Sequence, residues 1–361
     1  MQESFVAKAH GRVNLIGEHT DYNGGWVLPT PIHQFTEVKI IKRSGIEIQV
    51  ESQSTSIHKK RSYSYQLGEE FHQGNWTDYI QGATKILSRF IQPLNQSISG
   101  FIATINSNVP EGSGLSSSAA LEMSFLKAIR KAYQLNISDI DLAKIGQRIE
   151  NEFVGARVGI MDQMATAFAH DGEALFLDTQ NLTYERIKLP LDQMDLLVIN
   201  SGISHKLSSK EGYNQRRQEC ELACSLLKVD SLRNLTLSDL DDDLPLKIKK
   251  RVKHVITENE RVFEAVAALK RADLVKLGQL FIESHYSMRD DYEVSLKEID
   301  TLVELSLEHK DVFGARLTGG GFGGSIVAIT KKGKGKDIAQ DVIEQYYLKT
   351  KQRAELMSAY E

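Results

Sequence analysis

Short apolar runs rich in β-branched residues alternate with polar turns along the first hundred residues. The runs cover residues 25–28, 35–42 and 46–50. Runs of this length, bounded by turn residues, are typical of β-strands. We therefore expect this part of the chain to form an antiparallel sheet.

Over residues 101–135 the pattern changes, and it predicts a strand, a loop of glycine and serine, and a long helix. From Leu121 to Tyr133, apolar residues recur at every fourth position. Residues four apart lie on the same face of an α-helix. The spacing predicts a helix over residues 119–134 whose apolar face packs on the sheet.

The rest of the chain predicts helices and strands in no regular order. Helices are expected at 139–154 and 160–169, strands at 174–179 and 196–201, mostly helix over 208–305, and a strand–glycine–strand unit at 312–330. Because strands and helices do not alternate steadily, the pattern favours an α+β fold over a doubly wound parallel sheet.

The 361 residues correspond to about two domains. With six prolines and no low-complexity linker, we expect these domains to lie close together, with a cleft between them.

The composition is that of an ordinary globular protein. Hydrophobic residues make up 41% and charged residues 25% of the sequence, which argues against collagen, coiled coil and long disorder. Lys and Arg number 44 against 48 Asp and Glu, a net charge of −4, so neither nucleic acid nor a membrane surface is an expected partner. No apolar stretch reaches the ~18 residues of a spanning helix, and no export signal is visible. We expect a cytoplasmic protein.

The two cysteines, Cys220 and Cys224, are four residues apart in a helical pattern. Thiols on one helix face in a reducing compartment stay reduced. A zinc site would need two further ligands, and no Cys/His cluster supplies them. We expect two inert thiols, packed or half exposed.

Two basic runs allow alternative interpretations. One lies at residues 247–254, after acidic residues at 241–243, and the other at 331–336. Either run could contact phosphate. However, acidic residues before a helix and basic residues further along it are also the arrangement that the helix dipole favours. The pattern favours solvated surface for both runs.

The segment Pro110–Ser118, PEGSGLSSS, leads directly into the predicted helix 119–134. Its small residues allow backbone N–H groups to turn inward, and a helix N-terminus carries unpaired donors and partial positive charge. Such an end binds anions, so a polyphosphate is the expected ligand. The alternative is a serine-rich helix cap without a ligand.

The run GGGFGG at residues 319–324 contains a formal GxGxxG. A dinucleotide-binding fingerprint must open a helix, whereas the run SIVAIT that follows has the character of a strand. We expect instead a tight hairpin that lets the backbone approach a ligand or the phosphate loop. A Walker A motif and the protein-kinase motifs HRD and DFG are absent from the sequence.

The segment GRVNLIGEHTDYNGG, residues 11–25, is dense in hydrogen-bonding side chains. Carboxylates beside histidine and tyrosine offer the mixture of donors and acceptors that the hydroxyls of a sugar require. The alternative is an Asp/Asn turn between two strands.

These three segments, in this order, resemble the motifs of the GHMP small-molecule kinases, and the first of them narrows the resemblance to the galactokinase family. The motifs are GRVNLIGEHTDYN at 11–23, VPEGSGLSSSAA at 109–120 and ARLTGGGFGG at 315–324. Stretches at 75–82, 150–163, 211–221 and 284–295 also look like galactokinase, so the resemblance covers nearly the whole chain. It implies the two-domain GHMP kinase fold with an active-site cleft. Residues 1–185 would then hold the sugar motif, the phosphate loop and the catalytic aspartate, and residues 186–361 the glycine-rich hairpin.

The resemblance also implies the catalytic pair. Asp162 matches the catalytic aspartate of the family, and Arg12 matches the arginine that faces it across the γ-phosphate. Asp162 would accept or orient the proton of the anomeric hydroxyl. Arg12 would keep Asp162 ionised and stabilise the charge on the transferring phosphoryl group. Taken alone, Asp162 could equally be an acidic residue in a first helical turn.

The binding residues follow from the same resemblance. Positions that match those that bind the sugar are Glu18, His19, Asp21, Gly159 and Tyr213. Positions that match the nucleotide site are Trp76 near adenine and, in the phosphate loop, Gly112, Ser113, Gly114, Leu115, Ser116, Ser117, Ser118 and Ala119. Ser117 and Glu150 resemble the pair that holds Mg²⁺ against ATP. Standing alone, Trp76 would be assigned to the core and Glu150 to a solvated helix face.

The implied activity is that of a galactokinase, which uses Mg·ATP and α-D-galactose and yields galactose 1-phosphate. The family resemblance also implies a monomer. Residues 30–33, Thr-Pro-Ile-His, replace the small-residue-plus-acid pattern of relatives. Related sugars therefore remain alternative substrates, namely N-acetylgalactosamine, galacturonate and arabinose. A galactose- and ATP-binding sensor without catalysis is a further alternative, although the intact SSSAA loop weighs against it.

Overall fold

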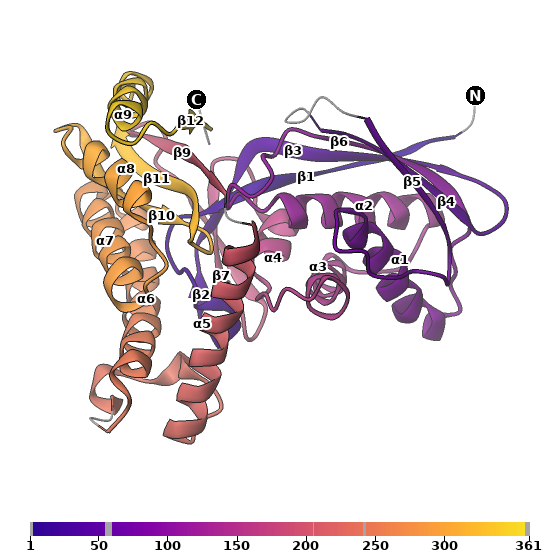
Figure 1. The fold of residues 1–361 in the computed structure, drawn as a ribbon, viewed down its shortest axis with the longest axis horizontal. Coiled ribbons are helices and arrows are strands. Elements are labelled where there is room, and N and C mark those ends of the chain that lie inside the picture. The colour runs from indigo at the N-terminus through magenta and orange to yellow at the C-terminus, as the bar shows by residue number, and fades with distance from the viewer. Residues whose placement is uncertain (1–2, 55–59, 205, 241–242, 358–361) are drawn as a thin grey trace. The chain divides into compact units, whose positions relative to one another are not determined.

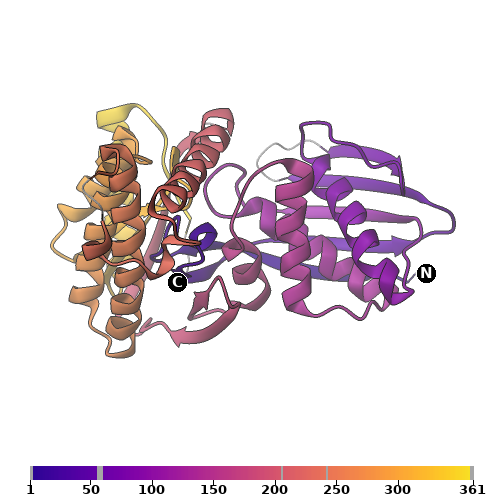
Figure 2. The ribbon, with the colours of Figure 1, turned by 90° about the horizontal axis from the view of Figure 1, so that it is seen from below.

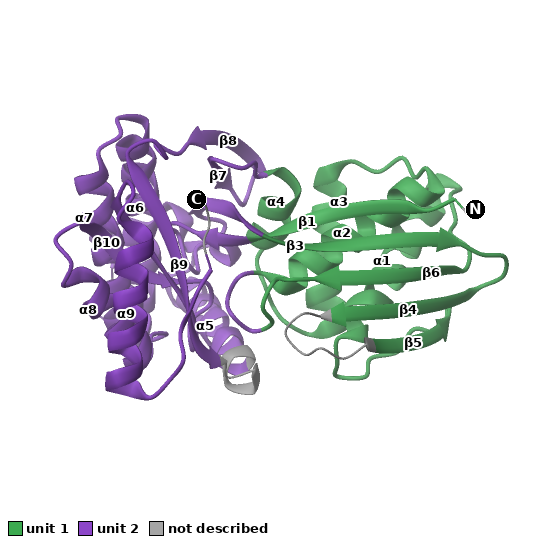
Figure 3. Ribbon diagram, turned by 90° about the horizontal axis from the view of Figure 1, so that it is seen from above, with its two compact units in different colours: residues 1–11, 34–111, 116–168 green, residues 12–33, 112–115, 169–361 purple. Residues whose placement is uncertain are grey.

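The computed structural model describes residues 3–54, 60–204, 206–240 and 243–357, and the chain divides into two compact units (Figure 3). The first unit consists of residues 1–11, 34–111 and 116–168, and the second of residues 12–33, 112–115 and 169–361. The first motif and part of the phosphate loop thus belong to the second unit. The predicted domain boundary after residue 185 stays a prediction.

A five-stranded sheet forms one layer of the first unit, in the order β1-β3-β6-β4-β5. Its strands are β1 (Phe5–Asn14), β3 (Pro29–Lys42), β4 (Glu47–Ser54), β5 (Lys60–Gln66) and β6 (Phe101–Ser107). Two pairs are antiparallel, β3 with β6 and β4 with β5, but β4 pairs with β6 in parallel, with Ile48 opposite Phe101. The expected antiparallel sheet is therefore mixed. The chain from β4 to β6 includes a strand and a helix, which is long enough for a parallel crossover.

Helices cover one face of this sheet, as two opposite views show (Figures 2 and 3). They are α1 (Thr77–Ile91), α2 (Ser117–Tyr133), α3 (Asp139–Arg148) and α4 (Met161–Phe168), with a π-helical stretch at Ile149–Val154. The predicted helix 119–134 is confirmed, and Phe125 and Ile129 on its apolar face are buried. The predicted helix 139–154 is also present, with a π-helical last part.

The second unit contains two smaller sheets (Figure 1). One has the order β2-β7-β8, and the other β10-β11-β9-β12. Their strands are β2 (Trp26–Val27), β7 (Glu173–Asp178), β8 (Thr183–Lys188), β9 (Met194–Ser204), β10 (Val312–Thr318), β11 (Gly323–Lys331) and β12 (Glu355–Leu356). β10 and β11 are antiparallel, with Arg316 opposite Val327. The strand–glycine–strand unit predicted over residues 312–330 is thus a hairpin.

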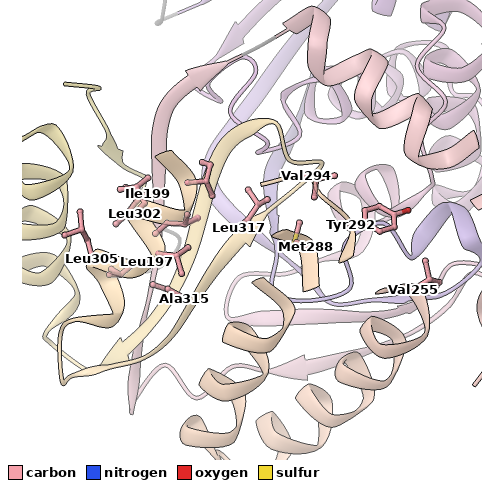
Figure 4. Packing of buried hydrophobic residues seen from close by; sticks show 14 of the residues in the cluster. Leu197, Ile199, Val255, Met288, Tyr292, Val294, Leu302, Leu305, Ala315 and Leu317 are labelled. Carbon is pink, nitrogen blue, oxygen red and sulfur yellow. The ribbon is translucent and has the colours of Figure 1, made fainter. Parts of the chain in front are cut away.

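Helices of the second unit pack against the hairpin and bury its apolar side chains. Those that contact the hairpin are α7 (Leu274–Tyr286), α8 (Lys297–Leu307) and α9 (Gly335–Thr350). Next to them, α6 (Leu246–Lys270) packs on α7, and α5 (Lys206–Leu227) packs on α6. Figure 4 shows Leu197 and Ile199 of β9 and Leu317 of β10 in one cluster with Leu302 of α8. This core holds the hairpin and α6 in fixed positions.

Short helical turns complete the described elements. They lie at Asp21–Asn23, Gln92–Leu94, Leu232–Asn234, Leu237–Asp239 and, in π-helical form, Ser287–Asp291. Over the part of the chain that the structure describes, no helix is both long and apolar enough to cross a membrane.

The expectation for the basic run 247–254 is wrong at two positions, because Arg251 and His254 on α6 are fully buried. Arg251 pairs with Glu219 at 2.7 Å and with Glu293 at 2.6 Å. Residues three apart share one helix face, and here that face points into the protein. Sequence alone showed the charge of the run but not which side of the helix is covered.

The lysines of the other basic run, 331–336, lie exposed around the turn that leads into α9, as expected. The cysteines are free, with Cys220 buried and Cys224 half buried. Burial raises the pKa of Cys220 to about 11, which agrees with the expected unreactive thiol.

Candidate functional site

The loop of residues 112–115 is held in the second unit by Arg12 and by the glycine-rich hairpin. The backbone N–H of Arg12 donates to Leu115 O at 3.1 Å, and its guanidinium Nη1 donates to Gly114 O at 2.6 Å. From the hairpin, Ser325 Oγ donates to Ser113 O at 2.8 Å. Since only 5% of Arg12 is exposed, its guanidinium is fixed at the loop.

The hairpin approaches this loop backbone to backbone. A β-carbon on Gly319 would lie 3.0 Å from Gly114 O, and one on Gly114 would lie 3.3 Å from Thr318 O. Both contacts are tighter than side chains normally tolerate, so glycine is needed on both sides. The prediction that the GGGFGG run lets the backbone approach the phosphate loop is confirmed.

The loop continues into α2 in the first unit, where Ser116 contacts the predicted catalytic residue. Ser116 has left-handed backbone geometry, with φ 58°, and makes no side-chain cap for the helix. Its hydroxyl instead donates to Asp162 Oδ2 at 2.7 Å. The cap alternative therefore does not describe Ser116. The first N–H groups of α2, from Ser117 to Ala119, have no partners within the helix.

Asp162 lies in the first turn of α4 and is half buried. The next residue, Gln163, donates through Nε2 to Glu122 Oε2 of α2 at 3.3 Å. Glu122 is fully buried, and its Oε1 has no hydrogen-bond partner among the described residues. Burial, with the charges of Glu150 and Asp162, raises the pKa of Glu122 well above its ordinary value. The surroundings of Glu122 thus favour its protonated, neutral form.

The two predicted magnesium ligands both lie in the first unit. Ser117 is half buried at the start of α2, and Glu150 is 6% exposed in the π-helical stretch. Among the described residues, no group of three or more His, Cys, Asp and Glu side chains could hold a metal ion. One hydroxyl and one carboxylate nevertheless fit Mg²⁺, since it usually retains waters and takes further oxygens from substrate phosphates.

Glu18, in the sugar motif, is almost completely buried in the second unit, at 1% exposure. Its Oε1 accepts from Gly319 N at 3.0 Å and from Thr318 Oγ1 at 3.3 Å, and its Oε2 pairs with Arg316. Burial raises the pKa of Glu18, and the Arg316 guanidinium opposes that shift. A carboxylate has about four acceptor sites, so these contacts leave room for one more donor.

His19 is held through both ring nitrogens. Nδ1 lies 2.9 Å from Tyr22 Oη, and Nε2 lies 3.2 Å from Gly320 O. Burial, with the nearby His254 and Arg216, lowers the pKa of His19 well below its ordinary value, so the ring is neutral. A carbonyl only accepts, so Nε2 carries the proton and Nδ1 accepts from the Tyr22 hydroxyl.

Aromatic side chains surround His19. The ring of Tyr213 lies 5.2 Å from that of His19 and 5.4 Å from that of Tyr22, centroid to centroid. Tyr22 Oη lies 2.7 Å from Tyr292 Oη, which in turn lies 3.1 Å from Cys220 Sγ. The hydroxyls thus form a buried chain that fixes the orientation of the rings.

The remaining predicted residues are placed as follows. Asp21 is half buried in a helical turn of the second unit, and its carbonyl accepts from Thr179 Oγ1 at 3.0 Å. Gly159 is buried just before α4. Trp76 is half buried directly before α1, where Asp78 fixes the preceding loop by accepting from Gly74 N at 2.7 Å. The last two lie in the first unit.

The structure therefore gathers the predicted residues into two groups. The second unit holds Arg12, residues 112–115 and the sugar residues Glu18, His19, Asp21 and Tyr213; the first unit holds Asp162, Glu150, Gly159, Trp76 and residues 116–119. The pairing of Arg12 with Asp162 stays a prediction.

Sequence reasoning gave no site role to several residues that contact the predicted ones or, in the case of Glu122, the direct neighbour of one, namely Tyr22, Glu122, His254, Glu258, Tyr292 and Arg316. Only two of them carried a usable signal. Tyr22 stands inside the first motif, and Glu122 stands three residues before Phe125, on the face that the apolar period buries. The others lie far along the chain from the residues that they hold.

Family models match three parts of this chain. The model described as the GHMP kinases N terminal domain matches residues 78–170, and the GHMP kinases C terminal model matches residues 265–348. A model described as the galactokinase galactose-binding signature matches residues 1–40. The three matches include the three motifs at 11–23, 109–120 and 315–324 on which the resemblance chiefly rests.

Curated relatives are similar over nearly the whole length. A galactokinase of Thermotoga neapolitana is 40% identical over 94% of this chain and 93% of its own. A galactokinase of Thermosipho africanus is 41% identical over 94% and 93%, and one of Thermococcus kodakarensis is 39% identical over 93% and 92%.

Solved structures share the fold. The structure of Lactococcus lactis galactokinase complexed with galactose superimposes with a TM-score of 0.90 at 31% identity, covering 99% of this chain and 93% of that one. Methanococcus jannaschii mevalonate kinase has a TM-score of 0.68 at 18% identity, covering 99% of both chains, and so shares the fold alone. The expected mixed arrangement of sheets and helices in this fold is confirmed.

Proposed function

Because this chain belongs to the galactokinase family of GHMP kinases and is an ATP-dependent sugar kinase, we propose that it transfers the γ-phosphate of ATP to the anomeric hydroxyl of α-D-galactose. The observation that carries the proposal is the 40% identity to a galactokinase over 94% of the chain. The gathering of Glu18, His19 and Tyr213 in one unit supports it further, since sugar hydroxyls need both donors and acceptors.

Asp162 is proposed to act on the acceptor hydroxyl. Its carboxylate would accept the anomeric proton or orient that hydroxyl toward phosphorus. The hydrogen bond from Ser116 restricts the rotation of the Asp162 side chain. Phosphoryl transfer depends chiefly on position and charge, so this restriction favours the reaction.

Arg12 is proposed to stabilise the phosphoryl group in transfer. Its bonds to Gly114 O and Leu115 O hold the guanidinium at the loop that would carry the phosphates. The N–H groups at the start of α2 would bind phosphate oxygens, as helix N-termini do. Trp76 is proposed to lie beside the adenine.

Mg²⁺ is proposed to be held by Ser117 and Glu150, which supply a hydroxyl and a carboxylate oxygen. When bound with ATP, the ion would neutralise charge on the β- and γ-phosphates.

Residues 30–33, whose departure from the pattern of relatives made related sugars alternative substrates, have in part a structural role. Thr30 is fully buried and donates to Glu173 O at 2.9 Å, and Ile32 is 1% exposed in β3. Packing thus accounts for two of the residues that departed from the expected pattern. Asp21, Gly159 and Tyr213 are proposed to contact the sugar with Glu18 and His19.

An ADP-release assay over a panel of sugars tests the proposal. The panel contains galactose, glucose, N-acetylgalactosamine, galacturonate and arabinose, each with and without Mg²⁺. We expect galactose to have the highest kcat/KM and turnover to need the metal. A higher kcat/KM for another sugar would replace the substrate, and no turnover of any sugar by folded protein would refute a catalytic function.

We further propose that the enzyme acts as a cytoplasmic monomer with small-molecule substrates and neither nucleic-acid nor membrane partners. The net charge of −4 supports the absence of an anionic partner. Light scattering of purified protein and fractionation of cells test these two points.

A further inference from the structure

The backbone of the sugar motif at Gly17–His19 is held in a conformation that is unfavourable by itself. Gly17 has φ +101° and His19 has φ 62°. The left-handed region costs free energy for a residue with a β-carbon, such as His19. At Gly17 a β-carbon would also lie 2.7 Å from Trp26 O. Such conformations persist where the surrounding structure fixes them.

Two side chains of α6, one helical turn apart, hold the peptide groups on both sides of Glu18. Glu258 Oε1 accepts from Gly17 N at 2.9 Å and from Glu18 N at 3.4 Å. His254 Nε2 lies 3.2 Å from Glu18 O, and since a carbonyl only accepts, Nε2 is the donor. Both side chains are fully buried. We name His254 and Glu258 the α6 clamp.

The α6 clamp is itself held in place by its neighbours. Ser284 Oγ lies 2.7 Å from Glu258 Oε1, and Arg261 Nε donates to Glu258 Oε2 at 2.8 Å. Burial alone would raise the pKa of Glu258, but Arg261 and Arg316 hold it well below its ordinary value. Glu258 is therefore charged and can accept the motif's N–H groups.

His254 and Arg316 complete the arrangement. Burial lowers the pKa of His254 to about 4, so the ring is neutral and its Nδ1 accepts from Ser287 Oγ at 2.9 Å. Arg316 lies 3.6 Å from Glu258 Oε1 and also pairs with the Glu18 carboxylate. Backbone and side chain of Glu18 are thus fixed by groups more than 230 residues away.

We propose that the α6 clamp positions Glu18 and His19 for sugar binding, so that His254 and Glu258 set the affinity for the sugar without touching it. The inference rests on the proposed function, because it takes Glu18 and His19 to bind the sugar. A site held in its binding conformation does not lose the affinity that ordering it would cost. His254 and Glu258 are positioning residues in this proposal.

Two substitutions of His254 test whether its N–H donor to Glu18 O is required. In His254→Leu the carbonyl of Glu18 loses its donor, whereas in His254→Gln the amide Nε2 can replace the imidazole Nε2–H. We expect the Leu variant to raise KM for galactose about ten-fold or more, with kcat and KM for ATP changed less than about three-fold. The Gln variant should restore most of the affinity, and Glu258→Gln should behave like the Leu variant.

Thr257→Ala is the matched control on the same helix, because among the residues that the structure describes the Thr257 hydroxyl bonds only to main-chain carbonyls of α6. It should leave all three constants unchanged. Thermal unfolding of each variant shows how much of any effect is lost stability. If the Leu and Glu258 variants keep the wild-type KM for galactose, or raise KM for galactose and ATP equally, the clamp does not act on the sugar site.

Amide exchange tests the positioning even if no sugar proves to be a substrate. In wild-type protein the amides of Gly17 and Glu18 should exchange slowly, and in both the His254→Leu and Glu258→Gln variants at least ten-fold faster. Equal exchange in wild type and variants would overturn the inference. A wild-type protein without sugar turnover, but with this change in exchange, would instead refute only the proposed function.

Discussion

Asp162, the predicted catalytic residue in the first unit, and the sugar motif in the second unit differ in burial. Asp162 is half buried, and its carboxylate accepts from the hydroxyl of Ser116. Glu18 and His19 are 1% and 3% exposed, and they are fixed through backbone and side chain together. A group that must meet substrate and exchange a proton remains accessible, whereas groups that select a substrate are set before it arrives.

The largest effect is expected from Asp162→Ala. Removing the carboxylate leaves the acceptor hydroxyl without its proposed base, so transfer should fall by about 10³-fold or more. Single-turnover kinetics measure the rate of transfer, and calorimetry measures the affinity for galactose. Galactose should still bind, because the sugar motif belongs to the other unit. Near-wild-type transfer in this variant would remove Asp162 from the mechanism.

Arg12→Ala should reduce transfer by about 10³-fold, since phosphate-facing arginines contribute on that scale. Arg12→Ala also removes the bond from the guanidinium to Gly114 O, whereas the bond from its backbone N–H to Leu115 O remains. Arg12→Lys keeps a positive charge but not the guanidinium fork. A Lys variant with wild-type kcat would show that charge alone is required.

Ser116 offers a smaller and sharper test of how Asp162 is held. Ser116→Gly removes the hydroxyl and tolerates φ 58°, whereas Ser116→Ala removes it and keeps the backbone cost. One lost bond to a charged group predicts a fall in kcat of about ten-fold in both. Wild-type kcat in the Gly variant would mean that the bond from Ser116 does not position Asp162.

The smallest effect on activity is expected from Glu122→Gln, since the raised pKa of Glu122 favours its protonated form, which a neutral amide resembles. The change should appear in the pH dependence of stability. Folding raises the pKa of Glu122 above its ordinary value of 4.5. At pH values between the pKa in the unfolded chain and the higher pKa in the folded chain, the folded chain therefore binds more protons than the unfolded chain. Its contribution to stability therefore falls as pH rises through that range.

Thermal unfolding from pH 4 to pH 9 measures this difference. The unfolding temperature of the Gln variant should decline less with rising pH than that of wild type. Parallel curves for the two proteins would show that Glu122 is charged in the folded chain. The ADP-release assay at pH 7 serves as the control, with kcat expected within about two-fold of wild type.

Local patterns in the sequence were enough for the elements around the site. The four-residue apolar period predicted α2, and the strand character of SIVAIT after GGGFGG correctly excluded a dinucleotide fold in favour of a hairpin. These features depend on residues close together in the chain. The same reasoning predicted that the backbone of the hairpin approaches a ligand or the phosphate loop, and the structure shows that Gly319 and Gly114 make this approach.

Tertiary structure alone decided the parallel pairing of β4 with β6 and the burial of Arg251 and His254. Strand direction depends on the connection between the strands, and the burial of a helix face depends on its neighbours, which no local pattern shows. The same holds for Glu258, because its hydrogen bonds to the backbone N–H groups of Gly17 and Glu18 depend on how α6 packs. The sequence by itself determined the family, because the motifs are contiguous, and it predicted the residues for the chemistry. The groups on α6 that hold the backbone at Gly17 and Glu18 became visible only in the fold, because their contacts join positions more than 200 residues apart.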